Sequence, residues 1–243
     1  MNRIAIVTIC RNAREDLERT FASIDAQTDR RFAHVVIDGA SADGSAELIR
    51  ARGERLACWV SEPDRGIYDA MNKGWRMAES DFVLFLNAGD ALAAPDALAR
   101  ALPQLDEGID IAYGDLILRE PDGGLRHKRY PDRITSAWLM RESPPHPAQF
   151  IRRALLERWG GYDERWRIAA DYAFFARAFW QGGLCLRKLP FAVSIFDTRG
   201  LSSRPGQMAH VAAERKAIQR LYAPFPWYAA YHAWAAFNRL IGR

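Results

Sequence analysis

Short apolar runs alternate with stretches of helical spacing in the first part of the chain, and this alternation restricts the possible folds more than any other feature. Four runs have the apolar, β-branched composition of buried strands, namely 4–9 (IAIVTI), 32–38 (FAHVVID), 57–60 (ACWV) and 82–86 (FVLFL). Helices are predicted after them, over 13–26, 44–52, 67–79 and from about Pro95. This β-α-β-α order predicts a largely parallel sheet with helices on both faces.

The second part of the chain is less regular. Strands are predicted over 111–118, 125–130 and 184–196. Helices are predicted over 153–159 and 170–181. A helical tail occupies 206–243 and is interrupted by Pro224 and Pro226. With 243 residues and 49% apolar content, the chain can bury a sizeable core. We therefore expect one α/β domain over 1–205 with a helical C-terminal appendage.

The net charge of +4 comes from the tail. From Arg204 onward six basic residues stand against the single acidic Glu214, whereas the remainder has 28 basic and 29 acidic side chains. A basic balance confined to the tail does not predict a nucleic-acid partner. Cys10, Cys58 and Cys185 lie far apart in apolar settings, which predicts buried thiols in a reducing, cytoplasmic compartment.

Polar side chains gather where the predicted parallel strands end. In strand order they are Thr8, Arg11 and Asn12, then Asp38, then Glu62, Asp64 and Arg65, then Asn87 and Asp90. In an open parallel sheet such strand ends meet at one crevice, where ligands bind. Carboxylates beside Arg11 and Arg65 suit a nucleotide diphosphate with a divalent cation, Mn²⁺ or Mg²⁺, because both ions prefer oxygen ligands.

The sequence lacks the motifs of several other well-known binding and catalytic sites. The chain has no G-x-G-x-x-G, and GASADGSA lacks the lysine of a phosphate-binding Walker loop. It also has no H-E-x-x-H, C-x-x-C or G-x-S-x-G. Classical dinucleotide binding, zinc proteolysis and serine hydrolysis are therefore not predicted.

Six segments in this order resemble the family 2 glycosyltransferases. They are VTICRN, VVIDGASADGS, SEPDRGIYDAMNKG, FLNAGD, PPHPAQFIRRALLERWGGYDE and RIAADYAFFAR. The resemblance covers roughly residues 3–205. It implies the GT-A fold, a Rossmann-like α/β fold with a mixed, mainly parallel sheet flanked by helices. It also implies a donor-binding half over about 1–107 and an acceptor half over about 108–205.

The same resemblance implies an inverting transfer from a nucleotide sugar, UDP-linked or alternatively dTDP-linked, to a glycan or lipid-linked saccharide. The subgroup that the chain resembles makes bacterial O-antigen, lipopolysaccharide and exopolysaccharide. The donor-contacting positions implied by the matching motifs are Thr8, Arg11, Asn12, Asp38, Asp64, Arg65, Asn72, Lys73 and Asn87. Asp38 matches the residue that accepts a hydrogen bond from a uracil-type base.

Two carboxylates match the family's metal and catalytic positions. Asp90 matches the last carboxylate of the D-x-D region and is the implied ligand of Mn²⁺ or Mg²⁺. Asn87 and Gly89 stand where the family often has further acidic residues. Asp171 matches the base that takes the proton of the acceptor hydroxyl, although Ala170 replaces an acidic neighbour that is usual in the family.

Further positions are expected on the acceptor side. His146 and Gln149 match a segment near the acceptor or the sugar. The aromatic rings predicted to stack on sugars are those of Trp159, Trp166 and Tyr172. The glycine-bearing loop DTRGLSSRPG, which carries Arg199, Ser202 and Ser203, is expected to close over the diphosphate.

Simpler structural roles stand beside the functional ones. Asp38 and Asp171 have the alternative of capping a turn or a helix, and Asp64 and Arg65 that of a surface turn. Two other functions also remain open. A nucleotidyltransferase would need a glycine-rich loop after the first strand, and VTICRNAREDL has no glycine. A non-catalytic nucleotide-sugar-binding protein would keep the fold without the base.

The tail from Tyr222 is rich in aromatic residues with basic residues around them, but no apolar run reaches the roughly 18 residues that span a bilayer. Two interpretations follow. The tail packs against the catalytic domain or a second copy of the chain, which would be a homodimer. Alternatively, it lies in the interface at the inner face of the cytoplasmic membrane.

Overall fold

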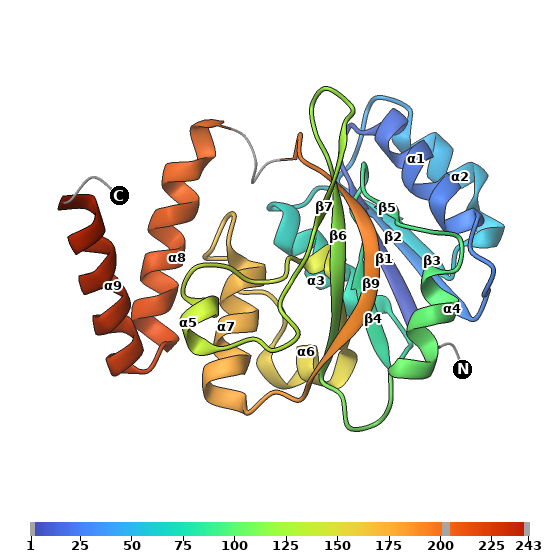
Figure 1. Cartoon of the computed structure of the whole chain (residues 1–243). Helices are drawn as coiled ribbons and strands as arrows, with labels where there is room; N and C mark the ends of the chain where they lie inside the picture. The colour runs from blue at the N-terminus through green and yellow to red at the C-terminus, as the bar shows by residue number, and fades with distance from the viewer. Residues whose placement is uncertain (1–2, 201–204, 241–243) are drawn as a thin grey trace.

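One mixed sheet organises the protein, as a computed structural model that describes residues 3–200 and 205–240 shows (Figure 1). Within these residues eight strands follow the order β3-β2-β1-β4-β8-β6-β9-β5, and β7 pairs with β6. The first four strands are β1 (Ile4–Cys10), β2 (Phe32–Asp38), β3 (Cys58–Ser61) and β4 (Phe82–Phe85). All their mutual pairings are parallel, as predicted.

Helices cover both faces of this parallel half, as the alternation predicts. The first four are α1 (Arg14–Asp25), α2 (Ser45–Ala51), α3 (Ile67–Met77) and α4 (Ala97–Ala101). Phe21 of α1 and Ile49 of α2 pack on the face of Cys10 and Val36. On the other face α3 lies so close to the sheet that a Cβ on Gly74 would come 2.3 Å from a methyl carbon of Val7. β1, β2 and β4 are therefore buried on both faces, which explains their continuous apolar runs, whereas β3 is only half-buried.

The second half continues the same sheet with antiparallel pairings. Its strands are β5 (Ala91–Leu92), β6 (Ile111–Arg119), β7 (Leu125–Lys128), β8 (Gln149–Arg152) and β9 (Leu186–Asp197). β8 runs antiparallel to both β4 and β6, whereas β6 and β9 are parallel. β5 and β8 were not predicted. The two residues of β5 are too few to show a periodicity, and the four of β8 run directly into the helix α6 (Arg153–Trp159) without a turn between them.

Further helices lie on the side of the sheet away from α1 and α2 (Figure 1). They are α5 (Ser136–Leu139), α6 (Arg153–Trp159) and α7 (Ala170–Gly182). α6 and α7 agree with the predicted helices. The tail forms α8 (Met208–Tyr222) and α9 (Phe225–Leu240), with Pro224 at the break between them.

α8 packs on α7, and α9 forms the outermost layer (Figure 1). Ile218 of α8 is fully buried, and Gln219 donates a hydrogen bond to the carbonyl oxygen of Met140 at 2.8 Å. No helix within residues 3–200 and 205–240 is both long enough and apolar enough to cross a bilayer. The expectation of three buried thiols holds only for Cys10, because Cys58 is half-buried and Cys185 is exposed.

Candidate functional site

The ends of the parallel strands converge, as predicted from their order. Cys10, Asp38 and Ser61 are register partners at the ends of β1, β2 and β3. The loops beyond them touch, since a Cβ on Gly39 would lie 2.2 Å from Oδ2 of Asp64. An Arg11 guanidinium nitrogen lies 4.0 Å from Oδ1 of the same carboxylate. Arg11 and Asp64 therefore face one crevice.

Asp38 is fully buried at this crevice and is already hydrogen-bonded. Its oxygens accept hydrogen bonds from the hydroxyls of Ser41 and Ser61 and from the amide of Ser41. Asn12, which has a positive φ of 49°, accepts a hydrogen bond from the amide of Ala42 at 2.9 Å. These contacts tie the loops after β1, β2 and β3 together. The predicted base contact of Asp38 would require one serine to release it.

Thr8 lies in the interior instead of lining the crevice. Its side chain is fully buried, and its hydroxyl shares a 3.0 Å hydrogen bond with Nε2 of His34 on β2. Thr8 precedes the strand end by two residues and points to the face covered by α1, where His34 packs against Phe21. The structure thus gives Thr8 a packing role and no access to a donor.

Arg65 and Lys73 belong to an ion-pair network around the SEPDRG loop. Arg65 contacts Asp69 and Glu164, and the Lys73 ammonium lies 2.8 Å from Glu62 and 3.4 Å from Asp69. The Arg65 side chain is largely exposed despite these pairs, whereas that of Lys73 is mostly covered. Arg65 thus stays accessible to a phosphate, while Lys73 holds the loop.

Asn72 clamps the GGYDE segment to α3. Its side-chain amide donates to the carbonyl oxygen of Tyr162 at 2.8 Å, and its oxygen accepts from the amide of Tyr162 at 2.9 Å and from the indole of Trp75 at 3.0 Å. It is almost fully buried. The side-chain nitrogen and oxygen of Asn72 are both hydrogen-bonded within the protein, so Asn72 has a structural role. In this conformation it has no free group for the predicted contact with the nucleotide sugar.

The segment Asn87–Asp90 forms a turn directly after β4. The amide of Asp90 donates to the carbonyl oxygen of Asn87 at 3.0 Å, and Gly89 has a φ of +101°. This left-handed conformation favours glycine, in agreement with the glycine found at position 89. The Thr20 hydroxyl fastens the turn to α1 through the carbonyl oxygen of Asp90 at 2.7 Å.

The carboxylate of Asp90 is buried and belongs to no salt bridge among the described residues. Its Oδ1 accepts the amide of Asp197 at 3.0 Å, and no lysine or arginine forms an ion pair with it in the described part of the chain. Burial is the main cause that raises the pKa of Asp90 to about 7. Asp197, which pairs with Arg199 and Arg119, was missed by the sequence analysis, although it directly precedes the TRG turn at the end of β9.

The oxygens present at this turn fit a divalent cation in part. Asp90 offers a carboxylate, and Oδ1 of Asn87 is buried without a hydrogen-bond partner among the described residues. Over the same residues no cluster of three or more His, Cys, Asp or Glu side chains forms a complete metal cage. A hard cation held here would complete its shell with diphosphate oxygens and water, the usual arrangement for Mg²⁺.

Asp171 stands in the first turn of α7, facing the acceptor half. Its Oδ1 accepts hydrogen bonds from the amide of Tyr172 at 2.8 Å and the hydroxyl of Tyr68 at 3.2 Å, and Oδ2 lies 3.4 Å from Nδ1 of His146. Burial acts to raise the pKa of Asp171. The hydrogen bonds and the His146 charge outweigh it, so this pKa lies below its usual value.

His146 links the predicted base to the turn after β4. Its other ring nitrogen lies 3.0 Å from the side-chain nitrogen of Asn87. An Asn87–His146–Asp171 chain therefore runs between the donor and acceptor halves. Gln149 is buried at the start of β8, where its side-chain nitrogen donates to Pro144 and its oxygen has no hydrogen-bond partner among the described residues.

The predicted sugar-stacking aromatics have different surroundings. Tyr172 is a core residue whose hydroxyl donates to the carbonyl oxygen of Leu139 at 3.0 Å. Trp159 lies under the guanidinium of Arg177, 4.6 Å from its ring centre. Ser202 and Ser203 of the late loop lie outside the described residues. Arg199 is half-exposed beside Asp16 and Asp197.

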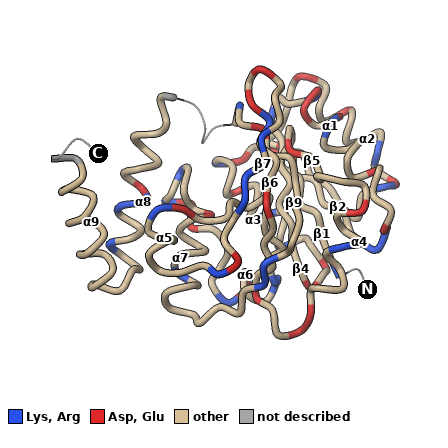
Figure 2. Tube along the Cα trace, viewed as in Figure 1, with Lys and Arg blue, Asp and Glu red and all other residues tan. Residues whose placement is uncertain are grey.

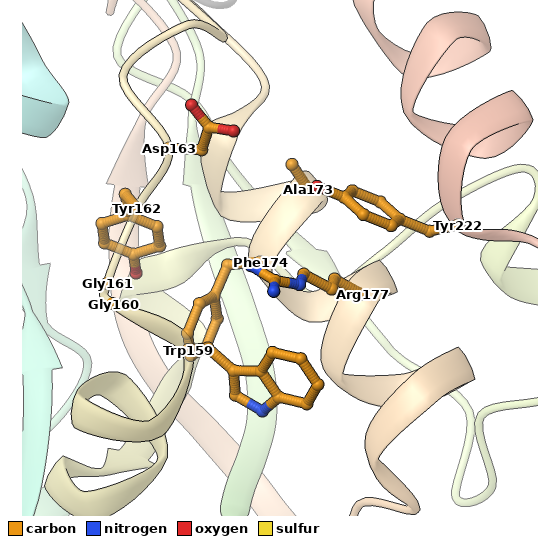
Figure 3. A pocket seen from close by; sticks show the side chains of 9 residues that line it. All are labelled: Trp159, Gly160, Gly161, Tyr162, Asp163, Ala173, Phe174, Arg177 and Tyr222. Atoms are coloured by element: carbon orange, nitrogen blue, oxygen red, sulfur yellow. The ribbon is translucent and has the colours of Figure 1, made fainter.

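Two cavities lie on the acceptor side. One, of about 240 Å³, is enclosed by the loop at Gly160–Asp163, by Phe174 and Arg177 of α7 and by Tyr222 (Figure 3). The other, of about 290 Å³, lies between the start of α3, the 164–168 loop and α8. Tyr68 lines the second cavity and donates a hydrogen bond to Asp171, so that cavity adjoins the predicted base. Trp166 lines it as well.

Comparison with known proteins agrees with this geometry. A sequence model of the glycosyl transferase family 2 matches residues 5–167. A PGL/p-HBAD biosynthesis glycosyltransferase of Mycobacterium bovis is 34% identical over 184 residues, which are 73% of this chain and 70% of the relative.

Two solved structures have a similar architecture. The S. aureus TarS fragment 1–349 in complex with UDP-GlcNAc matches with a TM-score of 0.70 at 17% identity, over 91% of this chain and 68% of that one. The mannosyltransferase PcManGT from Pyrobaculum calidifontis in complex with GDP-Man and Mn²⁺ matches with a TM-score of 0.63 at 20% identity, over 97% and 80%. At these identities the likeness shows the fold, which is the predicted GT-A fold.

Proposed function

The chain belongs to glycosyl transferase family 2, and from this premise we propose that it is an inverting enzyme that uses a UDP-sugar to extend a surface polysaccharide or glycolipid. The observation that carries the proposal is the Asn87–His146–Asp171 chain, because it connects the carboxylate of the proposed base to the turn after β4. The nucleotidyltransferase alternative has no such support.

In this proposal Asp171 takes the proton of the acceptor hydroxyl as that oxygen attacks the sugar. A lowered pKa keeps Asp171 ionised, and therefore able to accept the proton, at neutral pH. His146 and Tyr68 hold its two oxygens in place, so the base does not need to reorient during the reaction. One carboxylate suffices for a direct displacement, which inverts the anomeric carbon.

On the donor side, the exposed guanidinium groups of Arg11, Arg65 and Arg199 are suited to the diphosphate, since their planar donors match phosphate oxygens. In the same proposal Asp64 contacts the ribose and Asp38 contacts the uracil base of the nucleotide. Asp90 and Asn87 would hold Mn²⁺ or Mg²⁺. When bound, the cation offsets negative charge on the departing diphosphate.

A thermal-shift screen tests the donor assignment. We expect UDP-glucose, UDP-galactose or UDP-GlcNAc with Mn²⁺ to raise the melting temperature more than GDP-mannose or dTDP-glucose, because a ligand that binds only the folded state stabilises it. A ligand at a hundred times its Kd adds about 2.7 kcal/mol. A larger shift with GDP-mannose would contradict the UDP assignment.

UDP release separates an enzyme from a binding protein. With the best-stabilising UDP-sugar, the enzyme releases UDP over repeated turnovers, faster when an acceptor glycan is added. A nucleotide-sugar-binding protein would show the thermal shift without this release.

The acceptor is proposed to enter the cavity of about 290 Å³ that adjoins Tyr68. Its volume is close to the lower end of small-molecule pockets, which fits a single sugar unit. Trp166 supplies an aromatic wall, and Arg65 and Glu164 supply polar groups at the rim. The M. bovis relative, named for PGL/p-HBAD biosynthesis, makes a lipid-linked acceptor a consistent choice.

The outer face of α9 is proposed to rest on the cytoplasmic face of a membrane. Trp227, Trp234 and Phe237 are exposed there, and α9 carries no Lys, Arg, Asp or Glu before Arg239 near its end (Figure 2). Basic residues on the adjacent α8 would add about 1 kcal/mol each near anionic lipid. Packing of α9 against a second copy of the chain is the competing explanation.

Co-sedimentation with vesicles tests the membrane proposal. We expect W234Q/F237Q to lower binding to vesicles containing phosphatidylglycerol by tenfold or more, because burying each such ring contributes about 1.5–3 kcal/mol. L125Q is the control, since Leu125 is equally exposed (62%) but lies on β7. Equal sedimentation of the wild type and W234Q/F237Q would contradict the proposal, and loss of a dimer in the double variant would favour the competing one.

A further inference from the structure

Glu214 of α8 reaches across to the backbone that precedes α7. Its Oε1 accepts the amide of Arg167 at 2.8 Å, and its Oε2 accepts the amides of Ile168 at 3.1 Å and Ala169 at 2.9 Å. The residue at the helix start, Ala169, has no side chain that accepts a hydrogen bond. A carboxylate from the tail therefore satisfies backbone donors that would otherwise remain free at the start of this helix.

The backbone held by Glu214 also holds the proposed base. Asp171 follows Ala169 by two residues. The carbonyl oxygen of Ile168 accepts the hydroxyl of Tyr68 at 2.7 Å, and the same hydroxyl donates to Asp171. A shift of the 167–169 segment would thus move the Tyr68 hydroxyl and the first turn of α7 together.

Two neighbours of Glu214 on α8 touch the same turn of α7. The Arg215 guanidinium lies 3.7 Å above the ring of Tyr172, and Gln219 donates to the Tyr172 hydroxyl at 3.1 Å. Glu214 is also the one acidic residue in the sequence Met208–Tyr222. No other carboxylate of α8 can therefore take over its hydrogen bonds.

We propose that Glu214 is a positioning residue for Asp171, which makes α8 a part of the active centre and not an appendage to it. The proposal rests on the function assigned to Asp171 above. Glu214 does not touch the substrate in this role. It fixes the backbone from which Asp171 and the carbonyl partner of Tyr68 project.

The test measures UDP release by E214A and by the wild type in the presence of Mn²⁺. The substrate is whichever of UDP-glucose, UDP-galactose and UDP-GlcNAc stabilises the wild type most. We expect kcat to fall about ten- to hundredfold, the scale for a misplaced catalytic group, while KM for the donor stays unchanged. The acidic limb of the pH–rate profile should move to higher pH. Burial raises the pKa of Asp171, and weaker hydrogen bonds from Tyr172 and Tyr68 would no longer outweigh it.

E214Q and K216A complete the comparison. A glutamine keeps one acceptor oxygen, so E214Q should recover part of kcat and of the pH profile. Lys216 is exposed on the same helix, and K216A should match the wild type. If E214A does not fold, an unshifted acidic limb in E214Q overturns the proposal.

The outcomes separate the two hypotheses. Wild-type kcat and pH profile in E214A, beside an inactive D171N, overturn the role of Glu214 alone. Near-normal turnover in D171N overturns the base assignment, and the positioning role with it. A fall in kcat with a shifted acidic limb in E214A, partly reversed in E214Q, supports the proposal.

Discussion

Replacing Asp171 with asparagine is expected to lower the rate of sugar transfer by about 10²–10⁴-fold, the usual contribution of a positioned base. Asparagine keeps the size of the side chain and can still accept hydrogen bonds from Tyr68 and from the Tyr172 amide. It cannot take a proton at neutral pH. Donor binding, measured by the thermal shift with a UDP-sugar and Mn²⁺, should remain, because in the proposed mechanism Asp171 contacts the acceptor hydroxyl and not the nucleotide.

The pH dependence of the wild type gives a second measurement of the same group. In the proposed mechanism the ionised form of Asp171 is the active one, so activity should be lost as the pH falls through its pKa. Because this pKa lies below the usual value, we expect no acidic limb from Asp171 above about pH 4. A limb near pH 6 would assign the base to another group.

Asp110 provides a matched control for D171N. It is a half-buried carboxylate that accepts one backbone amide, that of Cys185, at 2.8 Å. The register of β6 and β8 places it at the edge of the sheet opposite the strand ends. D110N should therefore transfer sugar at the wild-type rate. Near-normal transfer by D171N would remove Asp171 from the mechanism.

Replacing Asp90 with alanine is expected to abolish both transfer and its dependence on divalent cation. Asp90 supplies the one carboxylate at the Asn87–Asp90 turn, and Asn87 supplies only a neutral oxygen. Loss of a residue that merely supports a metal ligand typically costs 10–100-fold in affinity, so loss of the ligand itself should cost at least about a hundredfold. A Mn²⁺ titration of the thermal shift, with the donor present, measures the change.

Order of addition sharpens this test. The turn offers too few oxygens for a cation alone, so Mn²⁺ should stabilise the wild type weakly without a donor and strongly with one. D96A, which removes an exposed carboxylate paired with Arg100 beyond the turn, should behave as the wild type. A D90A variant that Mn²⁺ still activates would place the cation elsewhere.

The sequence predicts the parallel half well because each of its elements is determined locally. Runs such as IAIVTI are buried on both faces, and their alternation with helices predicts parallel strands. Parallel strands place their carboxyl ends at the same edge of the sheet. Arg11, Asp64 and Asp90 meet at one edge for this reason. The short strands β5 and β8 exist only because neighbouring strands pair with them, so no local pattern could predict them.

The site predictions that differ from the structure do so because of the direction in which the side chains point. Thr8 is two residues before the end of β1 and points to the helix-covered face, where His34 binds it. Asn72 faces the GGYDE segment, which is distant in the sequence but packed against α3. Position in a motif does not reveal which face a residue presents or which group it meets.

The sequence by itself determined the family, the parallel arrangement of the first four strands and the turn at Asn87–Asp90, since these depend on local composition and on motifs in fixed order. Only the tertiary structure joined Asn87, His146 and Asp171 into one chain and bound Glu214 of the tail to the backbone that precedes the proposed base. These contacts connect residues far apart in the sequence. Their formation depends on how strands and helices pack against each other, which no local pattern records.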